Sequence, residues 1–406
     1  MAFLSANSYM GLVVEATRGT LPTGGTPVYI PVTSPQTTPM QTFLRDEAFR
    51  GSPTTVYDQV QGVRHDEYEG KFYLYADTFG NFAKAVLGGT DTLTTTATVS
   101  GTSTTITTST LVMSGATWVV NAYAGMVVVT GSSSAAIASN TSTTLTLTTA
   151  GWSGGTPSTG AFTIGAANHN IKLLNNSTTG SQPQSYSIFD FDGANQFVMT
   201  GAQADSLAIT FGAEAAADAT VKFMANPYTS YTSAPAPFTS LSLSTEHLIP
   251  AWDTVITVSG INSGAALTYI QTGELKLERK TAPIFTMGTQ APLVNFAGPI
   301  EVSGKFTAVV NTNADAWSTG STAEALTRSP QVVTITLTDP NDSTSATPHS
   351  IAFTMNSVQF HTLKRTRGKE YTEVEVDFTA NANATDATTG YSPVQATIVN
   401  ATATPY

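Results

Sequence analysis

The sequence predicts an all-β protein with short helices. Threonine, a β-branched residue that suits strands better than helices, makes up about a sixth of the 406 residues. Apolar and polar residues alternate at strand spacing along much of the chain, as in residues 273–279 and 372–378. Helical periodicity is confined to two short stretches, and the length suggests two or three domains.

Charge and cysteine content exclude several classes of protein. The chain carries 17 basic and 28 acidic residues, a formal net charge of -11, whereas a non-specific nucleic-acid binder needs an excess of Lys and Arg. It has no cysteine, which excludes a disulfide framework, a thiolate metal site and a thiol nucleophile. The apolar content of 41% argues against wholesale disorder.

Residues 1–40 are predicted to form an extended N-terminal arm. Five prolines lie among Gly, Thr and Ser, and proline favours extended backbone over helix. Two interpretations stay open: a disordered tail, or an arm that docks on a neighbour through its apolar residues. The first residues lack a basic signal-peptide region, and no apolar window is long enough to span a bilayer, so we expect a soluble chain with no membrane span.

A β-hairpin is predicted over residues 54–76, followed by a helix at about Asp77–Leu87. In the hairpin, Tyr68, Phe72 and Leu74 alternate with charged residues, which puts the two sets on opposite faces. Asp77 or Thr78 can cap the helix, and Gly88-Gly89 ends it.

The composition changes abruptly after residue 92. No Lys, Arg, Asp or Glu lies between Asp91 and Lys172. Short β runs such as residues 126–129 and 144–148 alternate with Gly and Ser turns, and Trp118 and Trp152 are residues of the kind that fill a core. We therefore expect residues 93–165 to be a small inserted β module; a flexible low-complexity linker is the alternative.

The remaining chain suggests an internal duplication. A hairpin strand, a helix and three strand regions follow one another twice, with Gly70-Lys71-Phe72 in the first series and Gly304-Lys305-Phe306 in the second. The second helix is expected at about 314–326. The predicted domains are a first β-sandwich or barrel unit (41–92 and 166–238), a second such unit (239–380), and an extended C-terminal tail (381–406).

Charged residues on strand faces are the candidate functional residues. They alternate with apolar residues, so each strand has one buried and one wet face. Solvent exposure explains any one of them, and a functional role would require a partner or a lumen for the charged faces to meet. The set is Glu67, Glu69, Lys71, Glu274, Lys276, Glu278, Glu301, Lys305, Glu373, Glu375 and Asp377.

Motifs for catalysis are weak. Gly151-Trp152-Ser153-Gly154-Gly155 matches a nucleophile-elbow pattern but lies among turn residues without a following helix. The five histidines have no metal-binding spacing. We expect no enzyme activity, no catalytic residue, no cofactor and no metal site.

The chain resembles the tail tube (major tail) proteins of long-tailed, non-contractile bacteriophages. The resemblance rests on Leu44–Arg64, Ala76–Phe79, Ala85–Gly88, Gly273–Leu277, Thr281–Ile284 and Phe296–Lys305. The insert is similar to a small β module of phage structural proteins, in Asn121–Gly125 and Ile137–Thr141.

The resemblance implies a structural protein of the virion tail, assembled in the host cytoplasm. In that family, curved sheets of neighbouring subunits form a closed inner barrel, rings stack into a hollow tube, and DNA passes through without specific binding. The expected partners are copies of the chain, the tape measure protein and the tail terminator. A duplicated chain would form trimers with pseudo-sixfold symmetry; otherwise six chains are needed. The alternative is a secreted or virion-surface protein that binds glycans, with Tyr228, Tyr231 and Phe238 as candidate contacts.

Overall fold

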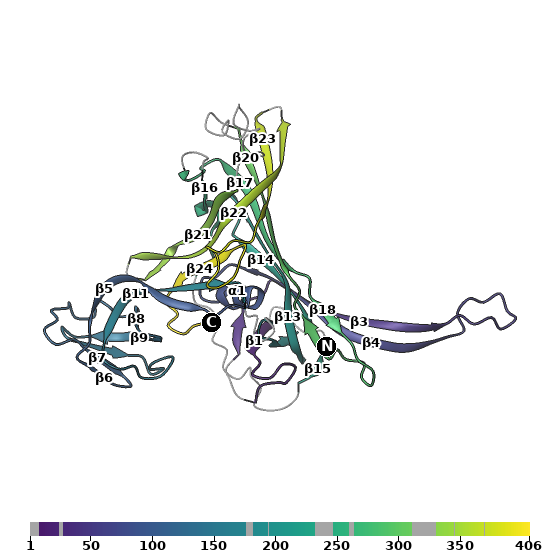
Figure 1. Ribbon diagram of the computed structural model, residues 1–406, viewed down its shortest axis with the longest axis horizontal. Coiled ribbons are helices and arrows are strands. Elements are labelled where there is room, and N and C mark those ends of the chain that lie inside the picture. Colours follow the sequence, from purple (N-terminus) through teal and green to yellow (C-terminus); the bar gives the residue numbers. More distant parts are fainter. Residues whose placement is uncertain are drawn as a thin grey trace.

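The computed structural model describes residues 8–23, 27–175, 182–193, 195–231, 247–259, 264–310, 330–344, 346–368 and 370–406. Strands dominate it (Figure 1), so the all-β prediction is confirmed. In the described ranges the helices are α1 (Phe79–Leu87) and a 3-10 turn, η2 (Ala251–Asp253). The second helix expected at 314–326 lies outside the described residues.

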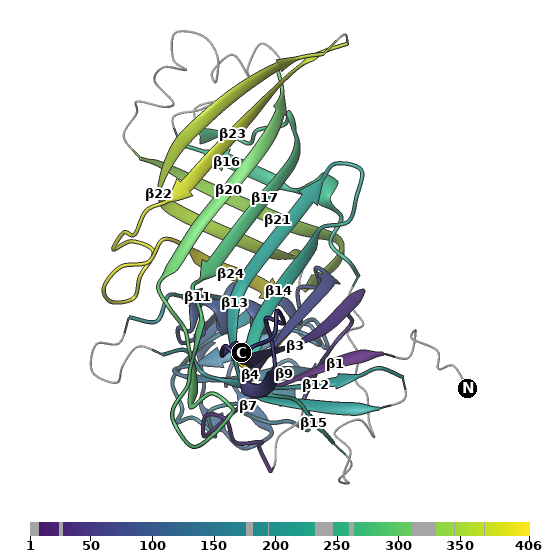
Figure 2. The ribbon, with the colours of Figure 1, turned by 90° about the vertical axis from the view of Figure 1, so that its right-hand side faces the viewer.

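The first sheet is a continuous antiparallel sheet in the order β3–β4–β14–β13–β17–β20–β23–β22. Figure 2 looks onto its broad face. Its strands are β3 (Ser34–Asp46), β4 (Asp58–Tyr73), β14 (Asp218–Ala225), β13 (Gln196–Gly212), β17 (Ile270–Arg279), β20 (Ile300–Val309), β23 (Thr372–Ala380) and β22 (Thr347–Arg367).

The second sheet packs against the first and shares β22 with it. Its order is β16–β21–β22–β24–β11–β5. Residues 350–354 of β22 pair with β24, whereas its residues from Val358 onward pair with β23, with a register shift between Phe360 and Thr362. The other strands are β16 (Val255–Val258), β21 (Gln331–Thr344), β24 (Gln395–Asn400), β11 (Ala161–Lys172) and β5 (Thr92–Thr102).

The N-terminal region forms strands that pair with other strands of the same chain. β1 (Tyr9–Val14) pairs with β2 (Val28–Ile30) and with β12 (Tyr186–Phe191), and β12 pairs in turn with β13, which also pairs with β15 (Thr229–Ser230). The buried carboxylate of Glu15 anchors this region: it accepts hydrogen bonds from Ser185 Oγ (2.6 Å), Ser187 Oγ (2.7 Å) and the Gly201 N–H (2.8 Å). β3 crosses the boundary expected at residue 40.

The uncharged segment has a core of its own. Its buried residues include Leu111, Val128, Ile137, Leu145 and Ile164, and they form a cluster separate from the main core. Between β5 and β11 lie β6 (Thr105–Ile106), β7 (Thr110–Val112), β8 (Val127–Thr130), β9 (Ser133–Asn140) and β10 (Thr144–Leu147).

The main core lies between the two sheets, with α1 at one end of it. Phe82 of α1 stacks on Phe72 of β4 with ring centroids 4.4 Å apart, and Phe79 meets Phe353 of β22 edge-on at 5.8 Å. Gly88 ends the helix in the left-handed conformation, φ +74°, as expected for a glycine at this position. The predicted helix is therefore confirmed.

Two local expectations were wrong. The hairpin joins β3 to β4, so it spans residues 34–73 instead of 54–76, and its prolines Pro35 and Pro39 sit in an edge strand, where proline is tolerated. Residues 381–406 are not a free tail. They contribute β24, which lies between β22 and β11, and Ala396 and Ile398 of this strand are fully buried. Without β24, neither β22 nor β11 would have a partner strand on that side.

One order of strand pairing occurs twice. In the first half of the chain it is β3–β4–β14–β13–β12–β1, and in the second it is β17–β20–β23–β22–β21–β16. In each half, one long strand, β13 or β22, carries a register shift and pairs on either side of it with different strands. A two-stranded ribbon, β18 (Ala282–Ile284) and β19 (Val294–Phe296), follows β17.

Candidate functional site: a charged face of the first sheet

All eleven candidate residues lie on one face of the first sheet. Successive side chains of a strand point to opposite faces, and directly paired residues share a face. Cross-strand pairs connect the set across β17, β20 and β23, since Glu274 lies opposite Lys305, which lies opposite Asp377. Glu69 and Lys71 of β4 lie on the same face, because directly opposed residues connect them across β14 and β13 to the charged positions of β17. Their alternate residues, such as Phe72 and Phe306, fill the core.

Ion pairs between neighbouring strands engage three lysines of this face. Lys222 Nζ lies 2.9 Å from Glu69 Oε2, Lys305 Nζ 2.9 Å from Glu274 Oε2, and Lys71 Nζ 3.0 Å from Asp218 Oδ2. The hydrogen bond that Lys305 donates to Glu274 raises the pKa of Lys305, with nearby carboxylates adding to the effect, and the bond that Lys222 donates to Glu69 raises the pKa of Lys222 in the same way. Both lysines therefore stay charged at neutral pH.

Carboxylates exceed lysines on the face. Glu373, Glu375 and Asp377 form a row on β23, while the register partner of Glu375 is Lys364. Near the other end, Asp205 lies between β14 and β17 at a register shift, and burial raises its pKa, aided by the charges of Glu278 and Glu67. The described face thus carries a net negative charge, and four of its lysines, Lys71, Lys222, Lys276 and Lys305, are in ion pairs.

The structure adds charged residues that the sequence argument omitted. Asp218 and Lys222 on β14 and Asp205 on β13 belong to the same face. The alternation of Val221, Lys222 and Phe223 carried the signal for β14. For Asp205 no such signal exists, because the register shift that turns it onto this face is invisible in the sequence.

The distal part of the β3–β4 hairpin projects from the body of the molecule (Figure 1). Its apolar side chains have little to cover them within the chain: Phe43 is 53% exposed, Leu44 65%, Val60 58% and Phe49 fully exposed. A two-stranded hairpin is marginally stable by itself, and exposed apolar groups gathered on one such element indicate an interaction surface.

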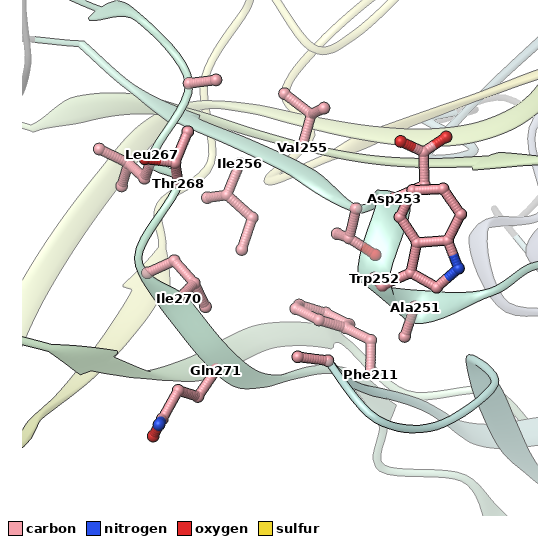
Figure 3. A pocket seen from close by; sticks show the side chains of 13 residues that line it. Phe211, Ala251, Trp252, Asp253, Val255, Ile256, Leu267, Thr268, Ile270 and Gln271 are labelled. Carbon is pink, nitrogen blue, oxygen red and sulfur yellow. The ribbon is translucent and has the colours of Figure 1, made fainter.

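A groove of about 280 Å³ lies beside η2 and the start of β17 (Figure 3). Phe211, Ile256, Leu267 and Ile270 line it, and the exposed Trp252 stands at its rim. Asp253 is the ionisable residue of this lining. Catalytic pockets bring several polar or titratable groups together, and this groove does not.

Other polar and aromatic groupings are explained by contacts within the chain. Carboxylate or ring atoms of His247, Asp339 and Asp342 lie within 4.8 Å of one another, but His247 Nδ1 already lies 3.1 Å from Asp342, and Asp339 accepts backbone N–H groups of its own turn. Tyr228 packs edge-on against Phe197, and Tyr231 against Phe189. The third glycan-contact candidate, Phe238, lies outside the described residues.

Comparison with known proteins identifies the family. A family model described as phage tail tube protein matches residues 175–380, which is more than half of the chain. The chain belongs to the phage tail tube protein family. No curated protein matches it.

Tail tube proteins are structural components of the virion tail, so this chain is a structural protein of a bacteriophage tail. The matched residues run from just before β12 to the end of β23, and they include β13, β14, β17, β20 and β23 of the charged face. In the part of the chain that the structure describes, no helix has the length and apolarity needed to cross a membrane.

Proposed function

We propose that copies of this chain assemble into rings that stack into a hollow tail tube, with the charged face of the first sheet lining the lumen. The observation that carries the proposal is the single broad sheet that is charged on one face and packed on the core with the other. A sheet of this kind closes into a barrel when copies join edge to edge, and closure removes its free edges.

The electrostatics of the face suit the passage of DNA. Four of its lysines are engaged by carboxylates, and the row Glu373, Glu375 and Asp377 leaves negative charge in excess. DNA-binding proteins gain affinity by neutralising phosphates with Lys and Arg, so a surface with paired lysines and surplus carboxylates offers little of that energy. The genome would therefore slide through the lumen without adhering.

The order of strand pairing that occurs twice in the chain supports three chains per ring. Each half contributes four strands to the first sheet, so one chain counts as two tube units and a trimer has pseudo-sixfold symmetry. A ring of six chains would follow if one unit per chain lined the tube. Before DNA enters, the same lumen would hold the tape measure protein, and the end ring would meet the tail terminator.

The insert would decorate the outside of the tube. Figures 1 and 2 place it on the opposite side of the two sheets from the charged face. The exposed hairpin of β3 and β4 would contact a neighbouring copy.

The absence of cysteine allows a direct test. We would introduce one cysteine at Ser303, which faces the same side as Lys276 and Thr379, and label it with a gold cluster in assembled protein. Thr105, exposed in the insert, is the matched outer control. Electron microscopy should show tubes, with gold in the bore for S303C and on the outer wall for T105C. Gold on the outer wall for both would refute the lumen assignment; protein that stays monomeric under all assembly conditions would refute the tube.

A further inference from the structure

A ribbon of two strands, β5 and β11, joins the uncharged insert to the two-sheet body of the molecule. Along this ribbon the other partner of β11 changes: residues 163–165 pair with β8 of the insert, whereas residues 167–172 pair with β24 of the second sheet. A register shift lies at the same place, between Ile164 and Gly165. A β-bulge bends the strand that carries it, and an isolated two-stranded ribbon is marginally stable. Insert and body can therefore move relative to one another at this point.

Residues 401–406, here called the strap, follow β24 and bind on both sides of this point. The strap forms no strand, and it ends beside α1 on the side of the insert (Figure 1). On the insert side, Ser134 Oγ of β9 donates a hydrogen bond to Ala403 O at 2.5 Å. On the body side, His169 Nε2 of β11 donates to Thr402 O at 3.0 Å, since a carbonyl oxygen can only accept. Insert and body thus hold adjacent carbonyl groups of the strap.

A buried carboxylate fixes the body side of this contact. His169 Nδ1 lies 2.6 Å from Asp91 Oδ2, and both side chains are fully buried. The Tyr406 N–H donates to the same oxygen at 2.9 Å. A buried carboxylate that loses its donors costs free energy, so Asp91 favours the state in which the strap is bound.

The ring of Tyr406 anchors the end of the strap on α1. An ideal Cβ at Gly80, in the first turn of the helix, would lie 2.1 Å from the ring, so the ring fits only because this residue has no side chain. The Tyr406 hydroxyl donates to Asp77 O at 2.8 Å and accepts from Asn400 Nδ2 at 2.7 Å. Lys84 Nζ donates to the backbone oxygen of Tyr406. Helix, loop and β24 together form a socket for this one residue.

We propose that the strap holds the insert in one orientation on the body, and that the insert swings about residues 164–166 when Tyr406 leaves its socket. The strap is held by side-chain contacts instead of a strand ladder, so it can detach while β5 and β11 stay paired. The device lies within one chain and operates in the free subunit as well as in an assembly.

Distances between two spin labels test this in the cysteine-free chain. T105C lies in the insert and K280C in the body, and both positions are exposed. Double-labelled full-length chain is diluted into excess unlabelled chain, so that pulsed electron paramagnetic resonance reports distances within one chain. G80A adds the methyl group for which the Tyr406 ring leaves no room, and alanine favours a helix more than glycine does, so α1 itself is not weakened.

A second variant acts on the insert side. S134A removes the bond from the insert to Ala403 O and nothing else of the strap. Its matched control is S132A, because Ser132 is exposed and lies two residues away on the same turn. Hydrogen exchange of the peptide covering residues 401–406 reports separately whether the strap has detached.

We expect one narrow distance in the labelled parent chain and in S132A, a broad distribution in G80A together with faster exchange of the strap, and a smaller broadening in S134A. A broad distribution in the parent overturns the proposal. An unchanged narrow distance in G80A also overturns it, because either the ring does not need Gly80 or the detached strap does not hold the insert. If circular dichroism shows that G80A does not fold, S134A decides, and distributions identical to those of S132A overturn the proposal.

Discussion

Arg279, the last residue of β17, ties the first sheet to the C-terminus of α1, and we expect its replacement by methionine to destabilise the chain. Its side chain is 4% exposed. The guanidinium donates to Val86 O, to Leu87 O at 3.1 Å and to Gly298 O at 3.4 Å. Val86 and Leu87 belong to the last turn of the helix, whose carbonyls lack partners within it.

The expected change in the free energy of unfolding follows from two opposing contributions of the Arg279 side chain. Hydrogen bonds from a charged donor contribute about 1.5–3 kcal/mol each, so three contribute about 6 kcal/mol. Burial lowers the pKa of Arg279 to about 10, and that fall corresponds to a desolvation cost of about 3 kcal/mol. R279M keeps the length of the aliphatic stem and removes the bonds, so the free energy of unfolding should fall by about 3 kcal/mol.

Urea unfolding followed by circular dichroism measures this difference, and hydrogen exchange of the peptide covering residues 79–88 locates it. The control is K280M, because Lys280 is 71% exposed and lies 3.8 Å from Glu301; such a pair contributes at most about 1 kcal/mol. An unchanged unfolding midpoint for R279M, or equal effects of the two variants, would show that the buried guanidinium does not hold α1 to the sheet.

Three further predictions concern the charged face, the core and the insert. Burial raises the pKa of Asp205, so the charged carboxylate destabilises the fold above that pKa, and this cost disappears at lower pH, where the group is protonated. D205N can still accept the Thr281 N–H, so it should raise stability by under about 1 kcal/mol at pH 7 and change nothing at pH 3 in parallel thermal melts. A Cβ on Gly304 would lie 2.7 Å from Glu274 O and 2.4 Å from Phe378, so G304A should cost about 1–3 kcal/mol in urea unfolding, whereas G70A, whose nearest neighbour would be Tyr68 at 3.2 Å, should cost less. Replacing residues 98–164 by an Asn-Gly turn joins the register partners Ala97 and Gly165, and should leave tubes of unchanged bore by electron microscopy; failure to fold would show that the insert supports the sandwich.

Local patterns sufficed where the structure depends on neighbours in sequence. The helix at α1 follows from its apolar stripe and from Gly88, and the charged face follows from strict alternation in β4, β17 and β23. The composition change at residue 92 likewise predicted a segment that has its own hydrophobic cluster.

Pairing between strands that are distant in the sequence determines the features that local patterns did not predict. β24 carries only a short alternation between polar flanks, and its place is decided by the two strands that need a partner between them. The sequence did not indicate β3 as a strand because of its prolines, which are unfavourable inside a sheet but acceptable at its edge. Asp205 joins the charged face only through a register shift. None of these follows from residues nearby in the chain.

The position of β24 also bears on when the protein becomes competent for assembly. His169 of β11 bonds Thr402, 233 residues later, and β24 lies between β11 and β22. During synthesis, the second sheet therefore waits for the last of its strands, and contacts so distant in sequence form slowly. A ribosome-bound chain would not yet display a finished subunit, so the proposed assembly would begin only after translation has passed β24.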